Sequence, residues 1–321
     1  MQKSDPIMIP AFDILVAGEL NPDLVLSGNV IPAFDDIDDL VGSASLTIGS
    51  ASARFACAAA RLGLKVTFAG VCGGDIFGRF MLDELSQRGV DVSGVSIDPL
   101  LQTGLRVIFN RPSAAASGKL ASLTYLGAIN CLRAEQVTSN CLAQARHLHI
   151  ASYFLQTAIQ PGLPDLFQRA RALGLTTSLT PGRARSGVLP DFGELLGQVD
   201  VFLPNENEAL VISGFPAVEA AAGALARQCG LVIVKLDAGG ALACRTQQVT
   251  RAERLPVPVV DTVGAGDAFD AGFLNGFLKG WGLEDNLALA AACGALSTRA
   301  AGGITAQPTL DEARQYILSV G

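Results

Sequence analysis

Short apolar runs alternate with segments of helical periodicity along almost the whole chain. Six runs have the length and composition of buried strands, at Phe12–Gly18, Lys65–Gly70, His147–Ile150, Thr176–Leu179, Val199–Leu203 and Leu231–Leu236. Between them, apolar residues recur at helical spacing, as in Ala51–Leu62 and Asp75–Arg88. This alternation predicts an α/β fold in which helices cover both faces of a mostly parallel sheet.

Two regions, at about 20–47 and 103–126, interrupt this alternation. They contain strand-like stretches such as Gly104–Asn110 and Lys119–Tyr125, with polar connections and no helical pattern. We expect these insertions to pair into a small β sheet that serves as a lid. The chain has no repeat and no long linker, so residues 1–321 are predicted to form one domain. Exposed lid strands also favour pairing between subunits, which suggests a homodimer through the lid.

The composition excludes several classes of protein. Half of the 321 residues are hydrophobic and 17% are charged, which is typical of a folded globular protein. The net charge of −7 disfavours nucleic acid as a partner, because phosphate contacts need a basic surface. Seven scattered cysteines without a Cys-x-x-Cys pair suggest reduced thiols, and no apolar run approaches the roughly 18 residues of a membrane span. A cytoplasmic protein without a membrane partner is expected.

The stretch DTVGAGDAFDAGFL, residues 261–274, combines a glycine-rich turn with an apolar helical pattern. Asp261 or Thr262 is expected to be the helix N-cap, and Gly264–Gly266 would offer free amides at the positive end of the helix dipole. Asp267 cannot bind phosphate itself, but a carboxylate beside an anion site suits a base acting on an attacking hydroxyl. Phosphoryl transfer accounts for both features. A tightly packed helix start with a solvated Asp267 is the alternative.

Other nucleotide-binding patterns are missing from the sequence. Gly264-x-Gly266 is followed by Phe269 where a dinucleotide motif needs its third glycine. No G-x-x-x-x-G-K-[ST] motif occurs. A nucleotide-dependent phosphotransferase with this sequence must therefore belong to a family without a P-loop.

With these features the chain resembles the ribokinase-like (PfkB) carbohydrate kinases. The stretch from Asp261 to Leu274 matches the C-terminal signature of that family throughout. Further family landmarks follow in the expected order, at Gly18–Asp23, Gly74–Gly78, Asn205–Glu208 and Lys235–Gly240. The resemblance implies a three-layer α/β/α fold with a small β lid. It also implies an ATP-dependent phosphotransferase with an alcohol acceptor, a sugar or a sugar acid.

The resemblance assigns the catalytic groups around the helix start. Asp267 would be the base toward the sugar hydroxyl. Gly264, Ala265 and Gly266 would form the anion hole around the γ-phosphoryl group. Because the transition state is loose, positioning and charge stabilisation are expected to dominate.

The same resemblance assigns cofactor contacts. Asn205 and Glu208 would lie near the phosphates of ATP, with Glu208 holding Mg²⁺ through water; alone, the pair reads equally well as a capping box. Lys235 and the turn from Asp237 to Gly240 would border the adenine and ribose, although a lone strand-end lysine commonly extends to water. Asp261 would belong to a loop that binds a monovalent cation such as K⁺.

The substrate side departs from the family pattern. Asp23 would grip sugar hydroxyls with support from Asn21, and the family motif Gly-Gly-x-x-x-Asn here reads Gly49, Ser50 and, in place of asparagine, Arg54. Arginine offers a cationic fork that suits carboxylate or phosphate. We therefore expect either an acidic substrate or an internal pair such as Arg54 with Asp23.

Several residues keep more than one reading. Asp270 shares a helical face with Asp267 and is either a polar helix residue or part of a metal-binding pair. Arg106 is either a lid or phosphate contact or a surface arginine. His147 and His149 are expected to be structural, since no catalytic partners accompany them. A nucleoside kinase of the same family and a catalytically silent sugar-binding homologue are the alternative functions.

Overall fold

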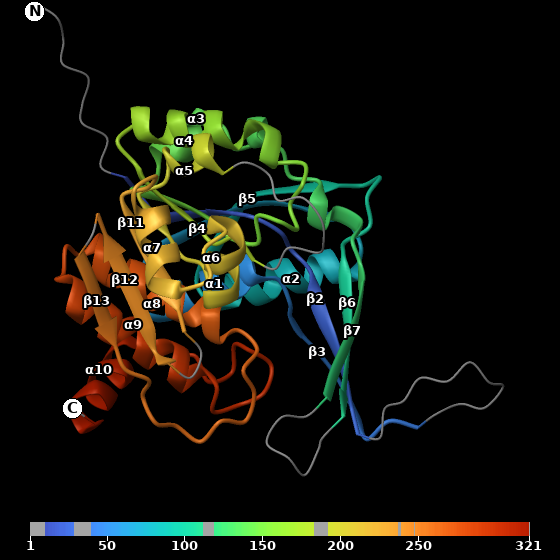
Figure 1. Ribbon diagram of the computed structural model, residues 1–321. Helices are drawn as coiled ribbons and strands as arrows, with labels where there is room; N and C mark the ends of the chain where they lie inside the picture. The colour runs from blue at the N-terminus through green and yellow to red at the C-terminus, as the bar shows by residue number, and fades with distance from the viewer. Residues whose placement is uncertain are drawn as a thin grey trace, which may run out of the picture.

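A large twisted sheet forms the centre of the molecule (Figure 1). The computed structural model describes residues 10–28, 40–111, 119–182, 192–236, 239–246 and 248–320. Within these ranges, nine strands lie in the order β13-β12-β11-β10-β9-β8-β1-β4-β5, and all neighbours from β11 to β5 are parallel. Their bounds are β1 Ile14–Ala17, β4 Val66–Gly73, β5 Val90–Asp98, β8 His147–Ile150, β9 Thr176–Leu179, β10 Val201–Phe202, β11 Leu231–Lys235, β12 Ala241–Arg245 and β13 Gln248–Ala252. Strand β12 runs antiparallel to both of its neighbours, β11 and β13. The predicted mostly parallel sheet is confirmed.

Helices cover both faces of this sheet, as Figure 1 shows. One face carries α1 Ala51–Arg61, α2 Ile76–Gln87, α8 Ala265–Leu278, α9 Leu283–Ser297 and α10 Leu310–Val320. The other carries α3 Ser139–Ala143, α4 Leu163–Ala172, α5 Gly193–Leu196, α6 Glu206–Ser213 and α7 Val218–Ala226. Strand β1 serves both cores, because Ile14 and Val16 enter the first core while Leu15 and Ala17 enter the second. The two-residue period of a strand produces this division.

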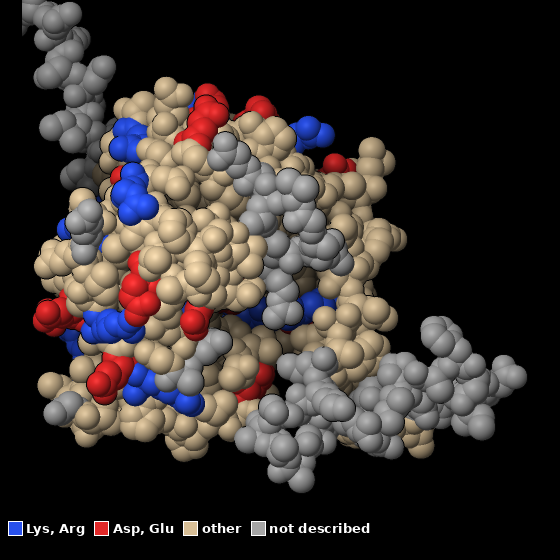
Figure 2. Space-filling view, viewed as in Figure 1, with Lys and Arg blue, Asp and Glu red and all other residues tan. Residues whose placement is uncertain are grey.

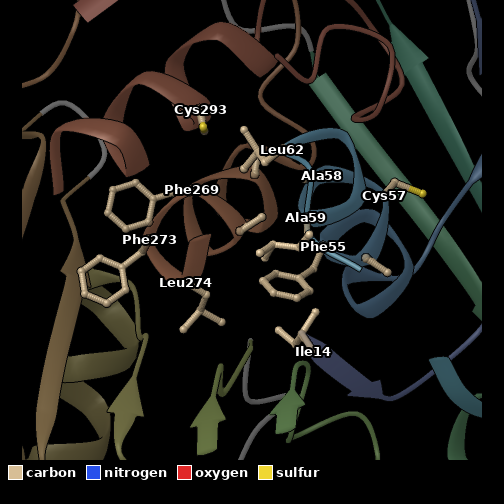
Figure 3. Packing of buried hydrophobic residues seen from close by; sticks show 14 of the residues in the cluster. Ile14, Phe55, Cys57, Ala58, Ala59, Leu62, Phe269, Phe273, Leu274 and Cys293 are labelled. Atoms are coloured by element: carbon tan, nitrogen blue, oxygen red, sulfur yellow. The ribbon is translucent and has the colours of Figure 1, made fainter. Parts of the chain in front are cut away.

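Helices α1 and α8 pack together over β1 and fix the position of the α8 N-terminus. Figure 3 shows Phe55 of α1 beside Leu274 of α8 and Ile14 of β1, and all three side chains are fully buried. Helix α9 approaches α8 closely at Gly272, where an added Cβ would lie 3.0 Å from the Cα of Ala290. A larger residue at position 272 would separate the helices. The small residues of α8 and α9 therefore permit tight packing.

A second, smaller sheet projects from the main body, on the right of Figure 1. Its order is β3-β2-β6-β7, with bounds β3 Ser43–Ile48, β2 Pro22–Ser27, β6 Leu105–Arg111 and β7 Lys119–Tyr125. Strands from the two predicted insertions pair in parallel between β2 and β6. The predicted small lid sheet is thus confirmed, whereas the domain count and the homodimer remain predictions.

The described ranges contain no single helix that is both long and apolar enough to cross a membrane. Helices α6 and α7 reach that threshold only when they are taken together, and they are bent by 64° relative to each other.

Candidate active site

The candidate site lies at the carboxyl ends of the central strands, where ligands of open α/β sheets bind. Strand β1 leads into the segment that carries Asn21 and Asp23, and β11 ends at Lys235. The first turn of α8 brings Asp267 to the same edge of the sheet, since Asp267 lies 4.0 Å from Arg54 of α1. Segments far apart in sequence therefore meet at one place.

Helix α8 begins at Gly264, which is in the left-handed conformation with φ 78°. The expectation that Asp261 or Thr262 would be its N-cap was wrong, because the chain makes one further turn before the helix starts. Asp261 instead joins two loops: its Oδ1 accepts the amide of Val263 at 3.0 Å, and its Oδ2 accepts the amide of Gly302 at 3.0 Å. This clip explains the position of Asp261 without a cation, and the K⁺ site remains a prediction.

Replacing Gly264 with alanine is expected to distort the start of α8. An added Cβ would lie 2.5 Å from the carbonyl oxygen of Gly303, and the left-handed backbone disfavours a side chain. We expect Gly264→Ala to lose about 1–3 kcal/mol of unfolding free energy in denaturant titrations. Gly223→Ala is the matched control, because Gly223 lies in α7 with open space around its Cβ position and should become slightly more stable. Equal stability of Gly264→Ala and the parent would contradict this account.

A cleft of about 620 Å³ opens beside the start of α8. Its walls come from the ends of β10 and β11, the loop after β13, the first turns of α8 and one face of α9. They are formed by Asn205, Lys235, Gly240, Arg254, Leu255, Val257, Val259, Thr262, Ala265, Gly266, Phe269, Ala291, Gly294, Ala295 and Thr298. An apolar surface with a few polar groups is the usual lining of a small-molecule site. Its size and its contact with the helix start suit a nucleotide.

Four predicted nucleotide contacts border this cleft: Asn205, Lys235, Gly240 and Gly266. Asp237 lies outside the described residues. Sequence reasoning did not assign Thr262, Phe269 or the small residues of α9 to a ligand cleft. The α9 residues Ala291, Gly294 and Ala295 have the spacing of an ordinary helix-packing face. Their small size leaves the cleft open.

Asn205 and Glu208 form the capping box that the sequence allowed. The Asn205 side chain accepts the amide of Glu208 at 2.8 Å, and the Glu208 carboxylate accepts the amide of Asn205 at 2.9 Å. The described residues include no cluster of three His, Cys, Asp or Glu side chains suited to a metal ion. A Mg²⁺ ion that arrives with nucleotide phosphates needs only one or two carboxylates, and the fixed Glu208 is compatible with this. Its metal role remains a prediction.

Asp267 lies in the first turn of α8, with its side chain 16% exposed. Burial raises the pKa of its carboxyl to about 7, while the Arg54 guanidinium opposes this rise and the Asp270 carboxylate adds to it. A group with such a pKa exchanges protons near neutral pH. Asp267 can therefore act chemically as a base.

Asp23 pairs with two arginines, Arg54 and Arg106, at the junction of the small sheet and the main body. We call these three residues the Asp23 cluster. Arg106 of β6 donates to both of its carboxylate oxygens, and Arg54 of α1 donates to Oδ2. The Asp23 side chain is 1% exposed, and its Oδ1 also lies 3.5 Å from the Asn21 amide. The internal pair of Arg54 with Asp23 is thus present. A direct contact between Asp23 and a sugar hydroxyl, which stays a prediction, would require an arginine to move.

The turn at Gly49 and Ser50 packs closely against Asn21 and Asp23. A Cβ on Gly49 would lie 2.4–2.5 Å from atoms of Asn21 and Asp23, so only glycine allows this close approach. Ser50 stands where the family has its second glycine and adopts φ 45°, a strained conformation for a residue with a side chain. Its hydroxyl caps α1 through the amide of Ala53 and donates to the carbonyl of Glu19 at 2.6 Å. These bonds hold the strained turn.

Asp270 pairs with Lys235 and is not free to join Asp267 at a metal. The Lys235 ammonium donates to both Asp270 oxygens at 2.8 and 3.0 Å and to the carbonyl of Leu203 at 2.7 Å. Thr180 donates to Asp270 at 2.8 Å. Of the two readings of Asp270, the structure supports a buried polar anchor of the helix.

The two histidines lie within the protein core on β8. Both are fully buried and bond to the Ser178 hydroxyl at 2.7 Å, and burial lowers the pKa of each ring. His149 also stacks on Phe55 with ring centroids 3.9 Å apart. These contacts agree with the expected structural role.

Comparisons with known proteins agree with this architecture. A family model described as pfkB family carbohydrate kinase matches residues 11–310. The chain is 29% identical over 312 residues to a ribokinase of Haemophilus influenzae, covering 95% of this chain and 98% of the ribokinase. It is 33% identical over 291 residues to a fructokinase of Klebsiella pneumoniae, covering 84% and 91% of the two chains.

The fold is similar to that of a solved structure, Arabidopsis thaliana ribokinase complexed with ribose and ATP. The TM-score is 0.82 at 22% sequence identity, over 96% of this chain and 99% of that one. This similarity confirms the ribokinase-like fold that the sequence resemblance implied. The chain belongs to the pfkB family of carbohydrate kinases.

Proposed function

We propose that this protein transfers the γ-phosphoryl group of ATP to a hydroxyl of a sugar, with Asp267 as the base. The observation that carries the proposal is the place of Asp267. Its neighbours in the chain, Ala265 and Gly266, line the nucleotide-sized cleft, and Arg54, which pairs with Asp23, lies 4.0 Å from its carboxylate. A carboxylate between a phosphate site and a polar acceptor site suits phosphoryl transfer.

The chemistry assigned to the protein is mainly positioning and charge stabilisation. ATP supplies the γ-phosphoryl group, and Mg²⁺ near Glu208 would offset the phosphate charge. The amides of Gly264 and Gly266 would donate to the phosphoryl oxygens at the positive end of α8, whereas the Ala265 amide already donates to the carbonyl of Thr262 at 3.2 Å. Asp267 would orient the sugar hydroxyl and take its proton as the new oxygen–phosphorus bond forms and ADP leaves.

The test is an ADP-release assay over neutral sugars, sugar acids, sugar phosphates and nucleosides, with purified protein, ATP and Mg²⁺. We expect ADP release that depends on the acceptor, with a phosphorylated sugar among the products by mass spectrometry. Turnover with nucleosides alone would favour the nucleoside kinase alternative. ADP release without any phosphorylated acceptor would reject the proposal.

The rate should depend on pH through Asp267. A base must be ionised to act, so protonation of a carboxyl whose pKa is about 7 removes activity as the pH falls. We expect kcat/KM to fall about tenfold per pH unit below pH 7 and to level off above it. Arg54→Asn should move this limb to higher pH, because Arg54 holds the pKa of Asp267 down. Rates that stay constant from pH 5 to pH 8, with coupling enzymes in excess, would contradict the assignment.

A further inference from the structure

We propose that the sugar acceptor carries an oxyanion group, a carboxylate or a phosphate, which binds Arg106 on the side of the Asp23 cluster away from Asp267. This inference rests on the proposed kinase function and narrows its substrate class. It follows from a series of contacts between charged groups: Asp267 lies near Arg54, Arg54 pairs with Asp23, and Asp23 pairs with Arg106.

The first argument concerns the hydrogen-bonding groups that the protein presents to the acceptor molecule. Asp23 is 1% exposed and both its oxygens accept hydrogen bonds from the arginines, so its acceptor capacity is taken up by protein donors. The Arg106 side chain is 31% exposed. A guanidinium has only N–H donors and no acceptor. An acceptor molecule therefore meets donors at this position, and unprotonated oxyanions match donors better than neutral hydroxyls do.

The second argument is charge. Two guanidinium groups share the single Asp23 carboxylate, which leaves one positive charge in this cluster. Asp267 balances that positive charge only while its carboxyl is ionised. When Asp267 takes the proton of the acceptor hydroxyl it becomes neutral, and the positive charge is no longer balanced. An anionic group on the acceptor restores the balance. Figure 2 shows basic atoms in the hollow between the main body and the small sheet.

The third argument is the unused hydrogen-bonding capacity of the arginines. Arg106 bonds to Asp23 through Nε and Nη2, and its Nη1 makes no hydrogen bond within the described part of the chain. Arg54 uses Nη2 for Asp23, its Nη1 lies 4.0 Å from Asp267, and its buried Nε has no partner there. Of the two arginines, Arg54 contacts Asp267, so its N–H donors are the better placed to contact the hydroxyl that reacts. An anion on Arg106 lies farther from Asp267 and opposes its ionisation less.

The experiment compares acceptors that differ in one acidic group. The carboxylate arm uses D-gluconate against D-glucitol and D-glucuronate against D-glucose, and the phosphate arm uses D-fructose 6-phosphate against D-fructose. Binding is measured by calorimetry with Asp267→Asn protein and ADP, and turnover is measured with the parent. We expect at least tenfold stronger binding for the acidic member in one arm. That arm identifies the oxyanion.

Arg106→Gln should weaken binding of the preferred acid about 100-fold and change binding of its neutral partner little. Asp23 keeps Arg54 in this variant, so the cluster is not left with an unpaired carboxylate. Unchanged ATP binding will show that the fold is intact. Arg146→Gln is the matched control, because Arg146 pairs with Asp13 at the opposite end of the strands.

The two proposals fail differently. Acidic sugars that bind selectively but are never phosphorylated would reject the kinase proposal and leave the anion site standing. If no acidic sugar in either arm binds better than its neutral partner, or if Arg106→Gln weakens both members equally, the anion site is rejected. Turnover of neutral sugars would then support the kinase proposal alone.

Discussion

Asp267→Asn is expected to lower kcat about 1,000-fold while ATP binding changes little. Asparagine has the same shape but cannot take the proton of the acceptor hydroxyl. Ala265 and Gly266 still line the cleft in this variant, so the groups proposed to bind the nucleotide at the start of α8 are unchanged. The loss should therefore appear in kcat and not in the dissociation constant of ATP. Steady-state ADP release and calorimetric ATP titration measure the two quantities.

Asp285→Asn is the matched control for this variant. Asp285 also lies in the first turn of a long helix, α9, but it is exposed and does not line the cleft. Its replacement removes the same charge from a comparable place on a helix and should leave kcat within about twofold. If Asp267→Asn retained kcat within tenfold of the parent, Asp267 would not be the base. A large loss in both variants would indicate a general electrostatic effect.

The sequence predicted the sheet and the helix start for a clear physical reason. A buried parallel strand such as Leu231–Lys235 is apolar at every position but the last, and the glycine-rich turn before Asp267 indicated a helix start nearby, although not its N-cap residue. The strands Ala241–Arg245 and Gln248–Ala252 were not singled out, and the second of them is the edge strand of the sheet, largely exposed and polar. Pattern reasoning depends on burial and is weakest at such edges.

The details of the candidate site depend on contacts that no local pattern records. The N-cap of α8 is Gly264, where the backbone is left-handed and lies so close to Gly303 that a side chain would clash with it. Arg54 could be identified as a departure from the family motif, but the second arginine on Asp23, Arg106, comes from the other insertion. The pairing of the two insertions brings these groups together. Sequence spacing cannot show that Asp23 is shared.

Breaking the buried pair of Asp270 and Lys235 is expected to lower the unfolding free energy by about 3–5 kcal/mol. Asp270 is 2% exposed and Lys235 is 14% exposed, so water solvates these charges only slightly. Asp270→Asn would leave the ammonium of Lys235 with the Leu203 carbonyl and a neutral amide. A buried charge left without a partner lowers the unfolding free energy far more than replacing both charged residues by apolar ones. Urea titration of the variant measures the effect.

The double variant Lys235→Met with Asp270→Leu separates charge from packing. It removes both charges and keeps side chains of similar length, so we expect it to recover most of the stability lost in Asp270→Asn. Asp165→Asn is the control, since Asp165 pairs with Arg169 on the exposed face of α4 and should cost less than about 1 kcal/mol. If the double variant were less stable than Asp270→Asn, the ion pair itself would be stabilising. Lys235 also lines the cleft beside α8, so the ATP affinity of the recovered double variant tests whether Lys235 contributes to nucleotide binding, as proposed.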